Sequence, residues 1–131
     1  MSRMRPAKLS RELARKVLEG YGEVAGVQCA VLFSSDGFEI ASHAADTAAS
    51  ARLAAIGSSL AALGTALAGE AGLGNFERTT IESDGGAVTI MRVGSSRSMS
   101  LAVVAGKDAV LGQLLWATQR CCQALAKLLD P

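Results

Sequence analysis

The chain has 131 residues, a length suited to one domain that buries about 65–70% of the surface its unfolded chain exposes. Its formal net charge of +1 implies no general electrostatic attraction to nucleic acid or to anionic membranes. The basic residues are nevertheless distributed unevenly, because six of the thirteen lie in the first sixteen positions.

The N-terminal part of the chain is expected to be a short basic arm over residues 1–7, followed by a single domain over residues 8–131. An amphipathic helix is predicted over residues 8–20, and glycines at its end stop it. Its apolar face has one residue at every fourth position: Leu9, Leu13, Val17 and Tyr21. The basic residues beside this face are expected to be a solvated surface, with a contact site for an acidic partner as the alternative.

Two strands follow, joined by the hairpin signal Asp36-Gly37. The run Val27–Ser34 is apolar on both faces in its centre, so we expect it inside a sheet that is covered on both sides. Residues 38–43 alternate between apolar and polar side chains, which favours a strand nearer an edge of that sheet.

The most unusual stretch is a long helix predicted over residues 46–74 and capped by Asp46 or Thr47. Arg52 and Glu70 are its only charged residues after the cap, although a helix of this length normally shows water a charged face. A stripe at three- and four-residue spacing is expected to pack in the core of the same domain: Leu53, Ile56, Leu60, Leu63 and Leu67. A membrane-spanning helix is disfavoured, because most of the other residues are small and gain little from lipid.

Three more strands and a last helix complete the predicted fold. Residues 76–83 are the most polar strand and indicate an edge, whereas residues 87–93 and 99–105 are strongly apolar. Asp108 is expected to cap the last helix, and Trp116 is expected to be a core or groove anchor within it. The fold class is therefore α+β, in the order α-β-β-α-β-β-β-α, with a five-stranded antiparallel sheet and helices on both faces, a profilin-like layout.

The sequence has no recognisable catalytic motif. His43 is the only histidine, which excludes a metal cluster built from histidines. The three cysteines lie in apolar patterns, so we expect unreactive thiols in a reducing cytoplasm and no disulfide framework. Lys107 follows a glycine as in a phosphate-binding loop, but Leu101 and Asp108 stand where that motif needs Gly and Ser or Thr. We therefore expect no enzymatic activity, no metal and no cofactor.

The order and texture of the segments resemble the Roadblock/dynein-light-chain family, in particular its single-domain bacterial members. The resemblance covers about residues 8–129 and rests on these stretches together: VAGVQCAVLFSSDGFEIAS, LAAIGSSLAALGTAL, FERTTIES, DGGAVTIMRV and SLAVVAGKDAVLGQLLW. It implies a homodimer, or a heterodimer with a paralogue, in which the central helix packs against its counterpart and the following strand pairs edge to edge. The helix pair would then be a platform for a small Ras-like GTPase, whose nucleotide cycle the dimer scaffolds or stimulates.

The expected sites follow from this resemblance and from the small residues of the central helix, which allow close approach of another backbone. The dimer contacts are expected at Gly57, Ala61, Gly64, Ala68, Phe76, Arg78, Thr80 and Glu82. The GTPase is expected on the outermost face of the helix: Arg52, Ala55, Ser59, Ala62 and Ala66. Arg52 is the only basic residue on this helix and hence a weak candidate for an arginine finger.

Two alternative functions stay open. The first is a dimeric scaffold of the same fold in a signalling or motility complex, without direct contact with a GTPase. The second is a small-ligand sensor domain, which requires a sizeable closed pocket with convergent polar groups. Neither nucleic-acid binding nor insertion into a membrane is expected.

Overall fold

The structure, a computed structural model, describes residues 4–24, 26–95 and 99–129. Across these residues, helices and strands follow each other in the predicted order α-β-β-α-β-β-β-α. The elements are α1 (Met4–Tyr21), β1 (Val27–Ser34), β2 (Glu39–His43), α2 (Thr47–Glu70), β3 (Arg78–Ser83), β4 (Gly86–Arg92), β5 (Met99–Gly106) and α3 (Leu111–Leu129).

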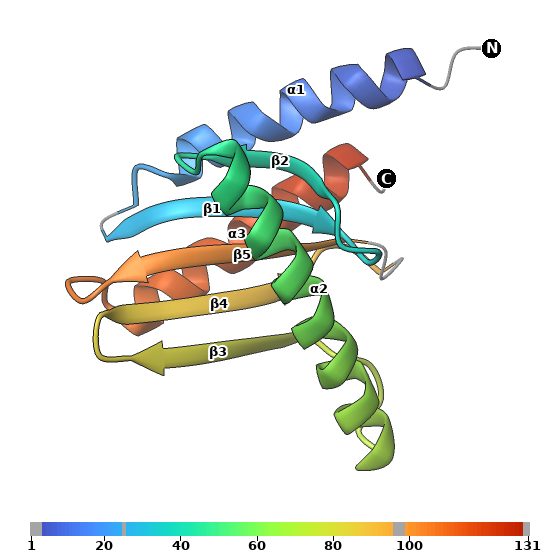
Figure 1. Cartoon of the computed structure of the whole chain (residues 1–131), viewed down its shortest axis with the longest axis vertical. Helices are drawn as coiled ribbons and strands as arrows, with labels where there is room; N and C mark the ends of the chain where they lie inside the picture. The colour runs from blue at the N-terminus through green and yellow to red at the C-terminus, as the bar shows by residue number, and fades with distance from the viewer. Residues whose placement is uncertain (1–3, 25, 96–98, 130–131) are drawn as a thin grey trace.

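The strands form one antiparallel five-stranded sheet in the order β2-β1-β5-β4-β3 (Figure 1). β1 lies inside the sheet while β2 and β3 form its edges, so these three sequence predictions are confirmed. The hairpin between β1 and β2 turns at Gly37, whose φ of +93° is rarely adopted by residues with a side chain. The N–H group of Gly37 donates to the carbonyl oxygen of Ser34 at 3.0 Å and closes this turn.

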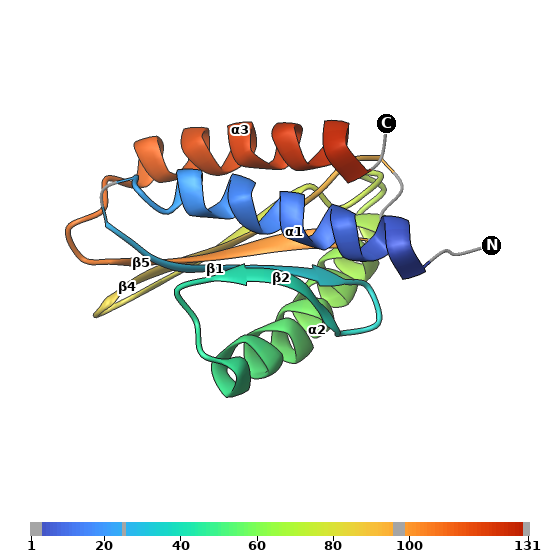
Figure 2. The same cartoon turned by 90° about the horizontal axis from the view of Figure 1, so that it is seen from above.

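Helices cover both faces of the sheet, as predicted. α1 and α3 lie side by side on one face, and α2 crosses the other (Figures 1 and 2). The larger core lies between α1, α3 and the sheet, where Leu18, Leu101 and Leu125 are fully buried. The hydroxyl groups of Tyr21 and Thr118 form a buried hydrogen bond that joins α1 to α3.

Some boundaries and positions differ from the sequence predictions. α1 begins at Met4, earlier than predicted, and residues 1–3 of the predicted arm lie outside the described residues. Pro6 fits in the first turn because the N–H groups there have no partner within the helix. α3 begins only at Leu111, so the prediction that Asp108 caps it is wrong.

Trp116 does not lie in the core, where the sequence allowed it to be placed. Its side chain is 63% exposed. It lies two residues after the buried Leu114, and two residues turn a helix by about 200°, which puts the indole on the opposite side.

Candidate interaction surface

The central helix α2 packs on the sheet through its smallest residues. Its buried positions are Ser50, Ala54 and Gly57. A Cβ atom on Gly57 would lie 2.8 Å from Cζ of Phe33, and a Cβ atom on Gly64 would overlap the ring of Phe76. The two glycines therefore let α2 rest on two aromatic rings of its own domain.

This packing corrects the sequence prediction for the small residues of α2. The glycines do allow a close approach, but what approaches is an aromatic side chain of the same chain and not a second backbone. Ala61 packs against the same cluster as Phe33 and Phe76, and Ala68 is half-buried on the same face of the helix. The dimer contacts predicted for Gly57, Ala61, Gly64 and Ala68 stay a prediction, although the side of α2 that carries them faces the sheet of the same chain.

The leucine stripe is the second correction. Leu53 and Leu60 are half-buried where the helix meets the sheet. The other three residues of the stripe are largely exposed: Ile56 by 60%, Leu63 by 66% and Leu67 by 72%. We call these three residues the leucine flank. The stripe faces sideways because the aromatic rings leave room only for small residues directly under the helix.

The exposed apolar surface makes α2 resemble a membrane span in composition. Of the helices in the described residues, α2 is the one long and apolar enough to cross a membrane, with a mean hydropathy of 1.4.

The N-terminus of α2 is capped by Asp46, whose carboxylate accepts a hydrogen bond from the N–H group of Ala49 at 2.7 Å. This confirms the predicted cap.

The sheet continues the apolar surface beside the leucine flank. Ile81, Val88 and Val104 are cross-strand neighbours on β3, β4 and β5, so they share one face of the sheet. That face is the one covered by α2, because Val88 packs against the cluster under this helix. α2 crosses the sheet away from the β3–β4 turn (Figure 1), and Ile81 is 45% exposed.

The edge strand β3 pairs only with β4 in the part of the chain that the structure describes, so its outer edge is open. Arg78 and Glu82 are exposed on this strand, and the Thr80 hydroxyl lies 3.0 Å from the Thr89 hydroxyl. Phe76 precedes the strand and is buried against Gly64. Of the four β3-region residues predicted at a dimer contact, Phe76 therefore supports α2 from inside.

The outermost face of α2 is exposed, as its sequence suggested. It consists of Arg52, Ala55, Ser59, Ala62 and Ala66. It lies on the other side of the helix from the sheet and carries no apolar side chain larger than Ala. The structure thus brings together two neighbouring surfaces on one helix, an apolar flank and a small-residue face.

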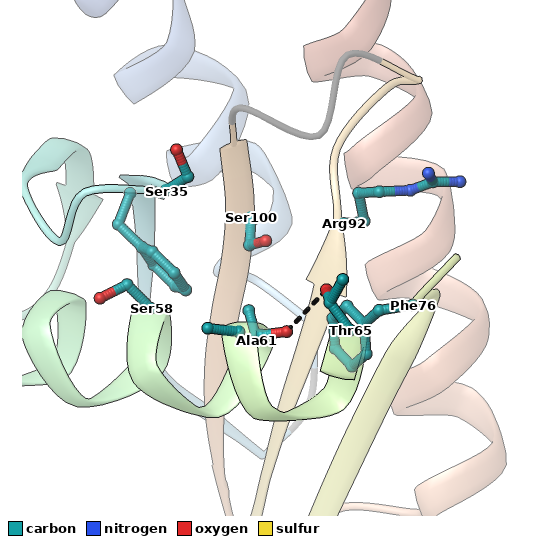
Figure 3. A pocket seen from close by; sticks show the side chains of 9 residues that line it. Ser35, Ser58, Ala61, Thr65, Phe76, Arg92 and Ser100 are labelled. Carbon is teal, nitrogen blue, oxygen red and sulfur yellow. Dashed lines mark hydrogen bonds between the residues drawn. The ribbon is translucent and has the colours of Figure 1, made fainter. Parts of the chain in front are cut away.

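A small cleft of about 100 Å³ opens between α2 and the sheet (Figure 3). Its lining is made by Phe33, Ser35, Ser58, Ala61, Ala62, Thr65, Phe76, Arg92 and Ser100. The hydroxyls of Ser58 and Thr65 each donate to a carbonyl of their own helix at 2.9 Å, and Arg92 binds the carboxylate of Glu77 at 3.1 Å. These groups are engaged within the protein, so the cleft does not have the convergent polar lining that a ligand sensor needs.

Reactive chemistry finds little support in the described residues. They contain no group of three His, Cys, Asp or Glu side chains that could hold a metal ion. Burial raises the pKa of the Cys121 and Cys122 thiols to about 12 each, and it also raises the pKa of Cys29. Such thiols stay protonated near neutral pH and are poor nucleophiles.

Comparison with known proteins places the fold. A family model described as the Roadblock/LC7 domain matches residues 13–105. A Roadblock/LC7 domain from Streptomyces avermitilis is 24% identical, with a TM-score of 0.82 over 89% of this chain and 98% of that one. The gliding protein MglB from Thermus thermophilus is 25% identical, with a TM-score of 0.81 over 91% and 90% of the two chains. An MglB with a tetrameric arrangement is 26% identical, with a TM-score of 0.81 over 91% and 89%. No curated protein matches the sequence.

Proposed function

The chain belongs to the Roadblock/LC7 family, and we propose that it is a non-enzymatic regulatory scaffold that forms a homodimer and binds a small Ras-like GTPase. The dimer uses the leucine flank and the open edge of β3. The GTPase contacts the outermost face of α2 and the protein works in the cytoplasm. Modulation of the nucleotide cycle comes from repositioning the groups of the GTPase itself, with Arg52 as the one cation on the contacting helix face.

The observation that carries this proposal is the leucine flank. Ile56, Leu63 and Leu67 are each at least 60% exposed, and the half-exposed apolar row that contains Ile81 lies on the face of the sheet that α2 covers. Burying the exposed part of one such side chain contributes about 1–2 kcal/mol, and a two-fold dimer buries each of them twice. A contiguous apolar patch of this kind is typical of a protein–protein interface.

The charges on β3 support an antiparallel pairing of the two edge strands. When Thr80 of one copy lies opposite Thr80 of the other, Arg78 of each copy lies opposite Glu82 of its partner. Opposite charges at such cross-strand positions contribute roughly 0.2–1 kcal/mol each. The residues at this edge thus fit a dimer register that satisfies both the backbone groups and the charges.

The dimer is tested by sedimentation or light scattering at micromolar concentration. Leu63→Glu should give a monomer, because it places a charge in an apolar contact. Ala66→Glu is the matched control, since it adds the same charge to the outermost face of the same helix and should leave the dimer intact. A monomeric wild-type protein, or a dimeric Leu63→Glu variant, would contradict this dimer.

The β3 register has its own test. Arg78→Glu should weaken the dimer by placing two like charges opposite each other, and Arg78→Glu combined with Glu82→Arg should restore it. An unchanged dimerisation constant in the Arg78→Glu variant would contradict the proposed β3 register but not the proposed contact between the α2 helices.

The GTPase contact is tested with a small Ras-like GTPase from the same cell. The wild-type dimer should bind it or change its rate of GTP turnover, and Ala66→Glu should lose this effect while remaining dimeric. A second candidate function, a scaffold in a motility complex, is favoured by the structural similarity to a gliding protein. Dimerisation without any effect on GTPase binding or turnover would favour that candidate.

A further inference from the structure

The charges of this protein are distributed unevenly among its helices. α1 carries five basic and two acidic residues, and α3 carries two basic residues and no acidic one. The layer formed by these two helices therefore has a formal charge of +5, although the whole chain has only +1. The near-neutral total thus conceals one strongly basic face.

Five cations of this layer have exposed side chains: Arg11, Arg15, Lys16, Arg120 and Lys127. The carboxylates of Glu12 and Glu19 on α1 are exposed as well. We call this surface of α1 and α3 the basic layer. Arg15 forms an exposed ion pair with Glu19 at 3.3 Å, which is worth little in water. The basic layer therefore retains a strong positive potential.

A large aromatic side chain lies within the basic layer. Trp116 on α3 is 63% exposed, and the guanidinium of Arg120 lies 5.0 Å from the centre of its ring. Leu9 on α1 is also exposed, by 58%. An exposed indole flanked by a cation is a combination found where proteins meet the headgroup region of a bilayer.

The basic layer is broad and lies away from the surfaces assigned to dimerisation. α1 and α3 run side by side across one face of the sheet, and α2 lies on the opposite face (Figure 2). The 19 residues of α3 correspond to a length of about 28 Å. Its two cations, Arg120 and Lys127, lie two helical turns apart in the C-terminal half of this helix.

We propose that the basic layer binds peripherally to an anionic lipid bilayer, with Trp116 at the level of the headgroups and α2 facing the aqueous side. Anionic lipids diffuse to each cation, so dispersed charges on two helices are all satisfied at once. An acidic protein would need carboxylates fixed at matching positions. The exposed indole gains from the interfacial region of a bilayer independently of such a match.

The proposed dimer would strengthen this binding. A two-fold axis perpendicular to a continuous sheet leaves both copies of the basic layer on the same side, so both can meet one membrane. This consequence rests on the proposed function. The binding of a single chain does not, because each copy carries the whole basic layer.

The single tryptophan of the chain makes the test direct, because all tryptophan emission comes from Trp116. The full chain is titrated with phosphatidylcholine vesicles that contain about one third phosphatidylserine, and with pure phosphatidylcholine vesicles. We expect co-sedimentation and a shift of the emission to shorter wavelength with the anionic vesicles only. Raising the salt from about 0.1 M to about 1 M should abolish both signals, because the charges are then screened.

A matched pair of variants locates the contact. Arg120→Glu in the basic layer should weaken vesicle binding by about 25-fold, since each basic residue near an anionic leaflet contributes roughly 5-fold and the reversal also adds repulsion. Arg52→Glu changes the net charge equally, but it lies on the outermost face of α2 and should have less than about a 2-fold effect. Folding of both variants is checked by circular dichroism.

Three results would overturn the proposal. The first is the absence of binding to anionic vesicles at about 0.1 M salt. The second is an equal loss of binding in the two variants, since it would reflect net charge and not the basic layer. The third is a shift of the Trp116 emission with poly-glutamate but not with vesicles, which would assign the basic layer to an acidic protein.

Discussion

Replacing Gly57 with Ala tests whether α2 packs on its own sheet through its small residues. The new Cβ atom would lie 2.8 Å from Cζ and 3.0 Å from Cε2 of Phe33. Phe33 is 1% exposed and belongs to the buried cluster under α2, so moving its ring disturbs the packing of its neighbours. Overpacking such a site costs about 1–3 kcal/mol, while Ala in place of Gly within a helix contributes roughly 1 kcal/mol of stabilisation. We expect the free energy of unfolding to fall by about 1 kcal/mol.

The control for this variant is Gly69→Ala in the same helix. A Cβ atom there meets nothing within 4 Å, so the substitution should stabilise the protein by up to about 1 kcal/mol. Urea unfolding followed by circular dichroism gives both values, at one protein concentration so that association contributes equally. Stabilisation by both substitutions would refute the reasoning, because Phe33 would then not limit the space at Gly57.

Three further predictions concern the cap, the alkaline limit and the thiols. Asp46→Ala should lower the free energy of unfolding by about 1 kcal/mol in urea titrations, and Asp46→Asn by much less; equal losses would argue against the cap. Burial raises the pKa of Tyr21 from 10.0 to about 12, so the folded state keeps a proton that the unfolded chain releases. This contribution to the free energy of unfolding is complete below pH 10 and is lost as the pH rises towards 12. The free energy of unfolding of Tyr21→Phe should therefore fall less steeply between these pH values. An equally steep fall in the variant and the wild type would contradict this role of Tyr21. In a thiol assay with Ellman's reagent, Cys29 should react first and the buried Cys121 and Cys122 only after unfolding; rapid reaction of all three thiols would exclude this burial.

Local patterns were sufficient to predict the strand order along the chain and the edge position of β3. A strand's alternation of polar and apolar residues reports directly on which of its faces is covered, because side chains alternate by geometry. The orientation of α2 could not be predicted in the same way. Periodicity shows that Leu63 and Gly64 lie on neighbouring stripes, but it does not say which stripe faces the sheet.

The missing signal for α2 was the size of its neighbours. Phe33 and Phe76 lie in the segments before and after the helix in the sequence, and their rings occupy the space beneath it. Gly57 and Gly64, which are seven residues apart, leave the space that these two rings occupy. Helical glycines matched to aromatic residues of neighbouring segments therefore indicate the inward face of such a helix.

For Trp116 the information was present in the sequence. Its angular position follows from the buried residues of α3, since Leu114 and Leu125 define the inward direction. The general preference of Trp for buried sites points to the core, but this angle decides its position. The clustering of basic residues in α1 was also visible, but its meaning depended on the position of α3 beside it, and only the tertiary structure provides that position.

The inward face of α2 also accounts for the absence of charge along its length. Two aromatic rings require small residues beneath the helix, so its bulky residues fall on the flank, where the proposed second copy covers them. The proposed GTPase covers the remaining side. A charged residue in the middle of a helix covered on three sides would lose its hydration without a fixed partner, at a cost of several kcal/mol. Arg52 and Glu70, the charged residues of α2, both lie outside the middle of the helix. The uncharged helix is thus the expected composition of an element that is exposed in one chain and enclosed in an assembly.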